Sequence, residues 1–488
     1  MPVSSLAPKI YADWRCKHSR PAFFGETDLP VPERFLQNVW HHQRLLREKL
    51  RTLDGQPVRV LHPGFWNREA GPDFRGAVVQ FGHERARSGD IEIDLHSAGW
   101  RTHGHDRNPN FANVVLHVVW EPDDVAKIPC PTLALEPFLD SSVSELTQWL
   151  GSETTKAWPT DLSGRCCAPL GELAEEKLDE LLQQAADVRL QRKGEEFQAR
   201  ARQSGWEQAL WEGIFRALGY KQNVWPMQRL AELISEPAGR AGKAGKREFP
   251  AQRSALAWQA RLLGMSGLLP GQPEEAEDES YLRAIWDIWW RERDEAGDLA
   301  LPKSLWRFNG IRPANFPQRR IALASHWLAD KNFFANLEAW FMTDHDESPR
   351  LNSLLKFFQV EEDNFWSWHW TFRSARLAKP QPLIGAQRVS ELAINVILPW
   401  FWMRAVVGKN LELKRRAEQI YFAWPAVGDN SVLRLARQRL LGGRSPRRMR
   451  TAAAQQGLLQ IVRDFCEHSN AICADCRFPG LVRSLRLP

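Results

Sequence analysis

The chain has 488 residues, of which 43% are hydrophobic and 25% charged, and its formal net charge is +6. This composition is that of an ordinary globular protein, and it excludes collagen-like, low-complexity and wholly disordered chains. The length corresponds to about two to four domains. The seven cysteines are an odd number at low density, which argues against a disulfide framework.

The apolar stretches of the sequence do not indicate a membrane protein. No apolar run reaches the roughly 18–20 residues that a membrane span needs. The longest candidate, residues 392–407, is short and carries Arg404. The first thirty residues lack a basic segment followed by an apolar one, so no export signal is indicated. We therefore expect a cytoplasmic protein without a membrane segment.

Residues 30–121 predict a small mixed unit of one helix and several strands. Residues 32–50 carry apolar side chains at helical spacing, starting just after Pro32. Residues 73–81 and 89–96 read as strands, the second with strict alternation, and residues 113–120 form an apolar, β-branched run typical of a buried strand. The predicted order is helix, three strands, a polar connection and a last strand.

After about residue 160 the sequence changes to long segments rich in Leu, Ala, Glu, Gln and Arg, which are typical of helices. We therefore expect an α+β protein, with a small mixed-sheet N-terminal domain followed by a large, mainly α-helical domain. The expected boundaries are 1–150 for the first domain, 160–462 for the helical domain and 463–488 for a cysteine-containing tail.

Acidic residues of the first domain suggest a metal site. Asp73 stands before one predicted strand, and Glu92, Asp94 and His96 alternate along the next, so these three side chains share a face. If the two strands form a hairpin, Asp73 meets that face at one end. Neighbouring carboxylates favour Mg²⁺ or Mn²⁺, which can activate water and stabilise charge on a phosphate.

Histidines are concentrated in the same region, which suits proton transfer or metal binding. His103 and His105 stand in a polar loop and are candidate site residues. His117 lies inside an apolar run, where a buried core histidine is expected. His103 and His105, followed by Asn113 and His117, superficially match the HNH nuclease motif, but that motif needs its last histidine on a helix, whereas this segment predicts a strand.

The motifs of this region resemble an uncharacterised bacterial family, a domain of unknown function. Its pattern is a PE…W helix, then NxxxGPDF, GD(I/V)E, a tryptophan, HxH and an LHVV strand. The chain carries these motifs at Glu33 and Trp40, at Asn67 and residues 71–74, at 89–92, at Trp100, at His103 and His105, and at 116–119. Further matches at residues 217–220, 310–317, 394–399 and 466–479 extend the resemblance over nearly the whole chain.

The order of helix, PD strand and acidic strand is also similar, more remotely, to the PD-(D/E)XK nuclease core. This resemblance implies a metal-dependent nuclease of DNA or RNA, with Asp73 and Glu92 as the metal ligands and Glu33 as an auxiliary helix carboxylate. Asp94 departs from the pattern, which has lysine there. His96 could supply the missing base or positive charge.

Three alternatives to a nuclease stay open, and one of them is another metal-assisted chemistry at the same site. Asp73 could cap a turn while Glu92 pairs with an arginine. The protein could also be a non-catalytic nucleic-acid-binding or assembly subunit with a degenerate nuclease-like fold, which the Asp94 departure favours.

A basic segment near the C-terminus could bind a phosphate backbone, because no acidic residue stands between Asp429 and Asp464. A solvated helix face with a basic linker would give the same pattern. The arginines expected to contact nucleic acid are Arg434, Arg437, Arg439, Arg444, Arg447, Arg448 and Arg450.

The C-terminal tail contains a possible second metal site. Cys466, Cys473 and Cys476, with His468, could bind Zn²⁺ through three thiolates and an imidazole. An iron–sulfur cluster with Cys16 as a distant ligand fits less well, because the downstream spacing differs. Buried thiols that pack the final helix are the third possibility.

Overall fold

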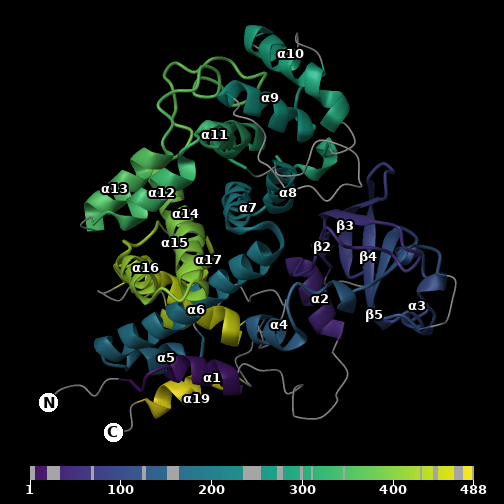
Figure 1. Ribbon diagram of the computed structural model, residues 1–488. Helices are drawn as coiled ribbons and strands as arrows, with labels where there is room; N and C mark the ends of the chain where they lie inside the picture. Colours follow the sequence, from purple (N-terminus) through teal and green to yellow (C-terminus); the bar gives the residue numbers. More distant parts are fainter. Residues whose placement is uncertain are drawn as a thin grey trace.

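The structure of the protein is a computed structural model. It describes residues 6–18, 33–67, 71–123, 128–150, 164–234, 254–271, 279–296, 300–308, 311–344, 347–428, 431–442, 449–466 and 476–485. A mixed sheet lies at one end of the molecule and helices form the rest (Figure 1). The α+β class expected from the sequence, with its N-terminal mixed sheet and helical remainder, is thus confirmed.

The sheet has six strands in the order β1-β3-β4-β5-β6, with β2 paired to β3. They are β1 (Val58–His62), β2 (Phe65–Trp66), β3 (Phe74–Phe81), β4 (Arg87–His96), β5 (Val114–Glu121) and β6 (Thr132–Ala134). β3 and β4 form an antiparallel hairpin, whereas β4, β5 and β6 run parallel. Because parallel neighbours need a crossover, the chain between β4 and β5 leaves the sheet, as α3 (Gly99–Thr102), η1 (His105–Arg107) and η2 (Pro109–Phe111).

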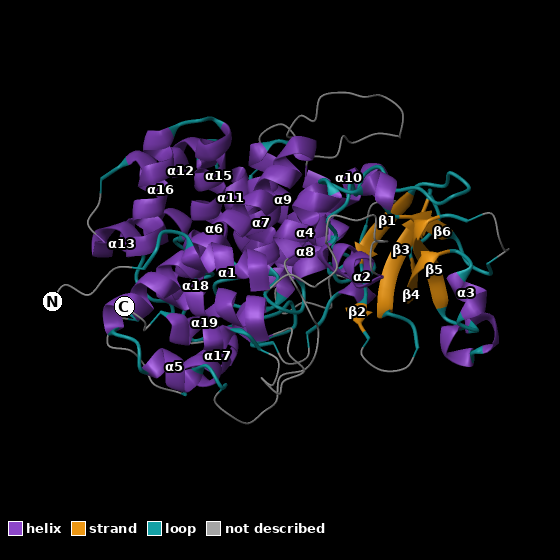
Figure 2. Cartoon of the chain, turned by 90° about the horizontal axis from the view of Figure 1, so that it is seen from below, coloured by secondary structure: helices purple, strands orange, loops and turns teal. Residues whose placement is uncertain are grey.

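The two faces of the sheet have different partners. Ile91 and Ile93 of β4 lie in one hydrophobic cluster with Leu36 and Trp40 of α2 (Glu33–His42). Side chains alternate along a strand, so Glu92 and Asp94 lie on the opposite face, where α3 covers them. Figures 1 and 2 show α2 and α3 on opposite sides of the sheet.

The rest of the described chain is mainly helical, with a longer irregular stretch at residues 359–385. Its α-helices are α1 (Ile10–His18), α4 (Val143–Leu150), α5 (Cys167–Gly171), α6 (Glu175–Ser204), α7 (Trp206–Leu218), α8 (Val224–Ile234), α9 (Ala255–Met265), α10 (Glu279–Ala296), α11 (Pro317–Ala329), α12 (Phe333–Met342), α13 (Glu347–Phe358), α14 (Ala386–Leu392), α15 (Leu398–Val407), α16 (Leu411–Ala423), α17 (Ser431–Leu441), α18 (Ala452–Ile461) and α19 (Phe478–Ser484). Short 3₁₀ and π segments are η3 (Glu136–Phe138), η6 (Lys303–Leu305), η7 (Pro313–Asn315), η8 (Ala393–Ile397) and η9 (Val462–Cys466).

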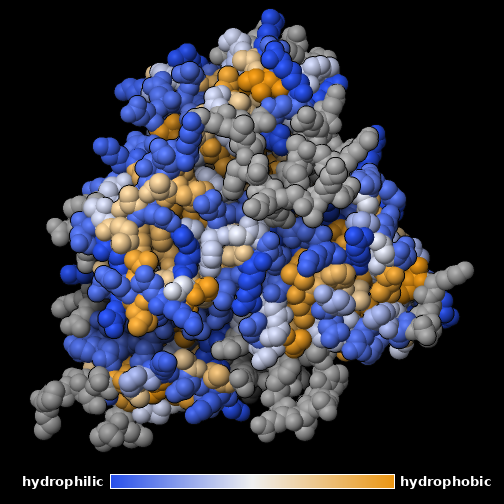
Figure 3. All heavy atoms as spheres, in the orientation of Figure 1, coloured by the Kyte–Doolittle hydropathy of each residue, from blue (hydrophilic) through white to orange (hydrophobic). Residues whose placement is uncertain are grey.

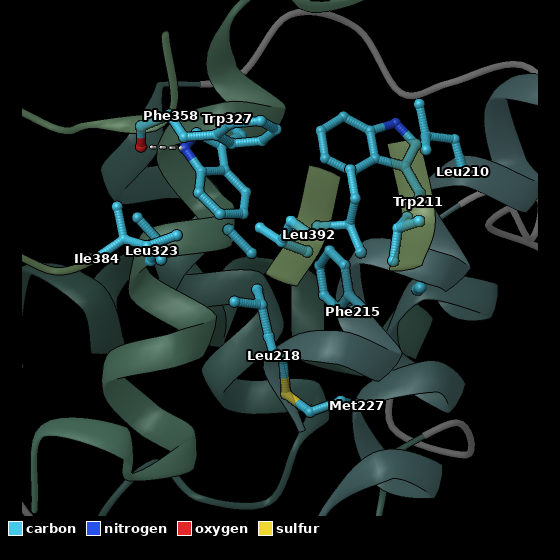
Figure 4. Packing of buried hydrophobic residues seen from close by; sticks show 14 of the residues in the cluster. Leu210, Trp211, Phe215, Leu218, Met227, Leu323, Trp327, Phe358, Ile384 and Leu392 are labelled. Carbon is cyan, nitrogen blue, oxygen red and sulfur yellow. Dashed lines mark hydrogen bonds between the residues drawn. The ribbon is translucent and has the colours of Figure 1, made fainter. Parts of the chain in front are cut away.

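The largest hydrophobic core lies among the helices and reaches the sheet. Trp211 and Phe215 of α7 pack in the same cluster as Leu392 of α14 (Figure 4). Trp327 donates its indole N–H to the backbone oxygen of Phe358 at 3.0 Å, so this buried polar group is satisfied. Val78 of β3 belongs to the cluster as well, and it joins the sheet to the helical core.

The N-terminal helix packs with the C-terminal residues and not with the sheet. Tyr11 and Trp14 of α1 share a cluster with Phe465 of η9 and Phe478 of α19. The hydroxyl of Tyr11 also donates to Asp464 Oδ2 at 2.8 Å. Within the described chain, residues 6–18 therefore pack with the cysteine-containing tail, across the expected 1–150 and 463–488 boundaries, which stay predictions.

One helix among the described residues is long and apolar enough to cross a membrane. α14, η8 and α15 run on as a helix of 22 residues, Ala386–Val407, longer than the apolar run from 392 that the sequence suggested. In its most apolar window, 78% of the residues are buried within the protein. This burial is typical of a core helix. On the face shown in Figure 3, hydrophilic residues separate several small apolar groups, as is usual for a protein surface.

Candidate metal centre

Acidic side chains converge where β3 begins and β4 ends. Asp73 precedes β3, and its backbone N–H donates to Glu92 Oε2 at 3.1 Å. Asp73 Oδ2 in turn accepts the backbone N–H of Ile93 at 3.2 Å. The hairpin expected from the sequence therefore does bring Asp73 and Glu92 together. Within the described chain, Glu92 has no arginine partner of the kind that the structural alternative required.

Glu33, the first residue of α2, is linked to Asp73 through Gln37. The side-chain nitrogen of Gln37 donates to Glu33 Oε1 and to Asp73 Oδ1, both at 2.9 Å. Gln37 lies one helical turn after Glu33, so both side chains point to the same side of α2. One amide group thus positions two carboxylates from different elements.

Asp94 lies at the centre of three imidazole rings. Its Oδ1 is 2.9 Å from His103 Nδ1, and its Oδ2 is 2.9 Å from His117 Nε2. His105 Nε2 lies 3.1 Å from Glu92 Oε1 and 4.0 Å from Asp94 Oδ2. One ligand atom each from Asp94, His103 and His105 lie within 4.8 Å of one another. This spacing allows the three side chains to share a metal ion.

The Nε2 atom of His105 is buried, and it lacks a hydrogen-bond partner of good geometry among the described residues. Its approach to Glu92 is close, but the atoms are not aligned for a hydrogen bond. An imidazole nitrogen in this position can offer its lone pair to a cation.

Aromatic rings hold the histidines in place. Trp100 of α3 is 3% exposed, and its ring centre lies 5.5 Å from that of His105 and 5.4 Å from that of His117. Phe111 stacks on His105 with ring centres 4.0 Å apart. Gly99 allows α3 to approach this closely, because a Cβ there would lie 2.6 Å from Asp94 Cγ. The cover over the sheet therefore fixes both the carboxylate and the rings.

Burial and like charges raise the pKa values of the acids. Burial, followed by the charges of Asp73 and Asp94, raises the pKa of Glu92 to about 9. Burial and then the charge of Glu33 raise the pKa of Asp73 to about 7. Burial and Asp94 also raise the pKa of Glu33, whereas burial lowers the pKa of His105. The site concentrates more negative charge than its own groups compensate, so it favours a cation.

Sequence reasoning identified only part of this arrangement. His96, predicted as a base, is exposed at the end of β4, and its side chain has no hydrogen bond or ion pair with a described residue. Asp94, which stands where the nuclease pattern has a lysine, is 1% exposed and lies at the centre of the site. Its alternation with Glu92 was the available signal. Gln37 and Trp100 were not expected to support the site.

The cysteines form no metal cluster among the described residues. Cys466 and Cys476 are half-buried against the core that contains α1 and α19, and Cys476 Sγ lies 3.8 Å from the backbone oxygen of Phe465. Cys473 and His468 lie outside the described residues. A zinc site in this tail stays a prediction.

The predicted nucleic-acid-binding arginines have different environments. On α17, Arg434 is exposed and Arg437 half-buried, whereas Arg439 is 4% exposed and lies in the interior. Arg450 is exposed as well, and Arg444, Arg447 and Arg448 lie outside the described residues. α17 lies among the helices and away from the sheet in Figures 1 and 2. Arg439 is thus not placed to contact a phosphate, and α17 does not adjoin the acidic site.

Fold and site together define an α+β protein with a carboxylate–imidazole cluster on a mixed sheet. Residues 33–427 match the profile of a family described as a protein of unknown function (DUF2851), and the chain belongs to this family. The resemblance to an uncharacterised family is thereby confirmed. No curated protein and no solved structure matches the chain. These comparisons do not establish the remoter similarity to PD-(D/E)XK nucleases.

Proposed function

We propose that the protein is a metal-dependent nuclease that hydrolyses phosphodiester bonds of DNA or RNA. The observation that supports this proposal best is the convergence of Asp73, Glu92 and Asp94 with His103 and His105 at the end of the β3–β4 hairpin. Such a site can bind a divalent ion, which activates water and stabilises the charge that develops on a phosphate.

The donor atoms favour a particular kind of metal. Mg²⁺ prefers oxygen ligands, whereas imidazole nitrogens suit transition metals such as Mn²⁺, Fe²⁺ and Zn²⁺. The group of Asp94, His103 and His105 supplies one carboxylate and two imidazoles. We therefore favour Mn²⁺ or Zn²⁺ at this position over Mg²⁺. Glu92 would be a further ligand of such an ion, since its Oε1 lies 3.1 Å from His105 Nε2.

The remaining acids can handle the proton of the attacking water. Glu33 is half-buried and has a raised pKa, and Gln37 holds it beside Asp73. A carboxylate with a raised pKa is a better proton acceptor at neutral pH than an ordinary one. Glu33 therefore takes the role of general base in place of the exposed His96. His103, with 52% of its side chain exposed, lies where a substrate would enter.

The surface next to Asp73 suits a nucleic acid. Trp66 of β2 pairs with Phe74, the residue after Asp73. The guanidinium of Arg34 lies 4.5 Å from the centre of the Trp66 ring. Aromatic rings beside arginines can stack bases and bind phosphates. This surface supports nucleic acid as the substrate more than a small phosphodiester.

The second candidate is a non-catalytic nucleic-acid-binding or assembly subunit. The observation that favours it is Asp94, which stands where PD-(D/E)XK nucleases carry a lysine. In this case the carboxylates and histidines would hold a structural metal ion, and the protein would bind nucleic acid without cleaving it.

One experiment distinguishes the two candidate functions. Mn²⁺ and Zn²⁺ are titrated calorimetrically into the wild type, Asp94→Asn and Glu92→Gln, and the same samples are assayed for cleavage of labelled single- and double-stranded DNA and RNA. The control is Glu84→Gln, because Glu84 lies in the turn of the same hairpin and pairs with Arg87 at the surface.

We expect the wild type and the control to bind metal and to cleave, and both site variants to lose metal affinity by about tenfold or more together with cleavage. Metal and nucleic-acid binding without cleavage by the wild type would favour the second candidate. A wild type that binds neither ion would refute both.

A further inference from the structure

A cavity of about 290 Å³ lies where the sheet domain meets the helices, away from the acidic cluster. Its wall includes Lys193 of α6, Arg216 of α7, Gln228 of α8 and Asn395 of η8. Arg47, from the segment after α2, lines the side that belongs to the sheet domain. The cavity is therefore built from both parts of the molecule.

The acids at this junction are paired by arginines other than Arg216. Four carboxylates each accept hydrogen bonds or ion pairs from a set of four arginines. The pairs are Asp140 with Arg44 (2.7 Å), Glu48 with Arg200 (2.7 Å), Glu212 with Arg200 (2.8 Å) and Arg47 (3.0 Å), and Glu232 with Arg229 (3.0 Å) and Arg47. This network is electrically balanced on its own.

Lys193 and Arg216 remain outside that balance. Arg216 donates to Gln228 Oε1 at 2.8 Å, but no carboxylate of the described chain lies within ion-pair distance of its guanidinium. Lys193 has neither a hydrogen bond nor an ion pair with any described residue. Glu196, the remaining acid of the wall, lies 3.8 Å from Arg192. Its charge raises the pKa of Lys193 and of Arg216 against the larger lowering by burial, but it forms an ion pair with neither. Two basic groups thus face the cavity without an acid of the described chain within ion-pair distance.

The surroundings make this excess charge unfavourable. Burial, followed by the charge of Arg189, lowers the pKa of Lys193 to about 7. Burial also lowers the pKa of Arg216. An anion between the two groups would compensate the charge, and guanidinium groups bind carboxylates and phosphates through paired hydrogen bonds.

Part of the wall is apolar. Phe197 and Trp149 line the cavity together with Val224 and Val396. The volume is near the lower limit of about 300–1,000 Å³ for small-molecule sites. A compact ligand with one charged end and one apolar or aromatic end fits this combination of walls.

We propose that this cavity binds a small organic anion, whose phosphate or carboxylate group lies between Lys193 and Arg216 and whose apolar body faces Phe197 and Trp149. The cavity is separate from the acidic cluster, so the proposal does not depend on nuclease activity. Because both parts of the molecule line the cavity, the bound anion stabilises their association.

Binding is measured calorimetrically and by thermal unfolding, with adenosine monophosphate, benzoate and inorganic phosphate as probes and with adenosine and benzamide as neutral counterparts. The protein is full-length Asp94→Asn without added metal, so that phosphate groups do not bind at the metal centre. The variants are Lys193→Met and Arg216→Met in the same background. The control is Arg202→Met, because Arg202 is an exposed cation on α6.

We expect at least one anionic probe to bind with a Kd of about 1 mM or lower, and to raise the unfolding temperature, while the neutral counterparts do not. Lys193→Met and Arg216→Met should weaken binding about tenfold or more, and Arg202→Met should not. Binding of both benzoate and adenosine monophosphate would show that the cavity accepts carboxylates and phosphates alike. Binding of adenosine monophosphate without benzoate would show that it requires a phosphate group.

Loss of fold does not explain the expected result. Lys193→Met removes an uncompensated, half-buried charge, so the ligand-free variant should unfold at the same or a higher temperature. The proposal is overturned if no anionic probe binds, or if the two variants bind as tightly as the control.

Discussion

Asp73 and Glu92 show how burial and neighbouring charge change single residues. Their pKa values are raised to about 7 and about 9, from ordinary values of 3.8 and 4.5. The folded protein therefore holds these protons more tightly than the unfolded chain does. Their contribution to stability is complete below the unfolded values, and it is lost as the pH rises through the folded values.

We accordingly expect the free energy of unfolding of the metal-free protein to fall as the pH rises from about 4.5 to about 9. Urea unfolding with a chelator present, at several pH values, measures this slope. Glu92→Gln should flatten it, because the amide does not ionise. Identical slopes for the wild type and Glu92→Gln would contradict the prediction, and saturating Mn²⁺ should remove the slope in the wild type.

Gly99 is a second residue whose role is set by its contacts. Gly99→Ala should lower the free energy of unfolding by about 1–3 kcal/mol, because the added Cβ would lie 2.6 Å from Asp94 Cγ. It should also weaken Mn²⁺ binding, since the carboxylate must move. The matched control is Gly271→Ala, where a Cβ meets nothing within 4 Å. Equal stability and metal affinity of the two variants would contradict this role.

At the scale of elements, the pairing of α6 and α18 depends on one glycine. A Cβ on Gly457 of α18 would lie 2.2 Å from the backbone oxygen of Leu182 in α6. Backbone atoms cannot turn aside as a flexible side chain does, so the two helices would have to separate.

Gly457→Ala is therefore expected to destabilise the protein by about 1–3 kcal/mol. Gly480→Ala, within α19, should instead stabilise it by about 0.5–1 kcal/mol, because a Cβ there meets nothing within 4 Å. The midpoints of urea unfolding measure both changes. A neutral Gly457→Ala would show that the contact between α6 and α18 is looser than the structure indicates.

Single helices and strands were easier to predict from the sequence than the elements against which they pack. The alternation of residues 89–96 and the apolar run 113–120 gave β4 and β5, because side-chain direction in a strand repeats every two residues. The position of α1 was not predictable in this way. Tyr11 meets Asp464 across most of the chain length, and no local pattern records such a contact.

At the scale of the whole molecule, Arg47 connects the sheet domain to the helical core. It pairs with Glu212 of α7 at 3.0 Å and with Glu232 of α8, and all three side chains are largely buried. Burial makes this link sensitive to the loss of Arg47, because Glu212 and Glu232 would then each keep a single arginine partner among the described residues, Arg200 and Arg229.

Arg47→Met should therefore lower the free energy of unfolding by about 3 kcal/mol. Arg87→Met is the control, because the Arg87–Glu84 pair is about half exposed (54% and 49%) and such pairs contribute less than about 1 kcal/mol. Urea unfolding of both variants tests the difference. Similar, small effects would show that Leu61 and Val78, and not Arg47, hold the two parts together.

The sequence alone determined the α+β class and the two strands that became β3 and β4, because periodicity is a local property. It predicted the meeting of Asp73 with Glu92 only on the condition that these strands form a hairpin, which the structure fulfils. Only the tertiary structure decided that Gln37 joins Glu33 to Asp73, that His117 and the loop histidines surround Asp94, and that Lys193 and Arg216 face one cavity. These contacts depend on the crossover between parallel strands and on helix packing, which bring distant residues together without leaving a repeating pattern in the sequence.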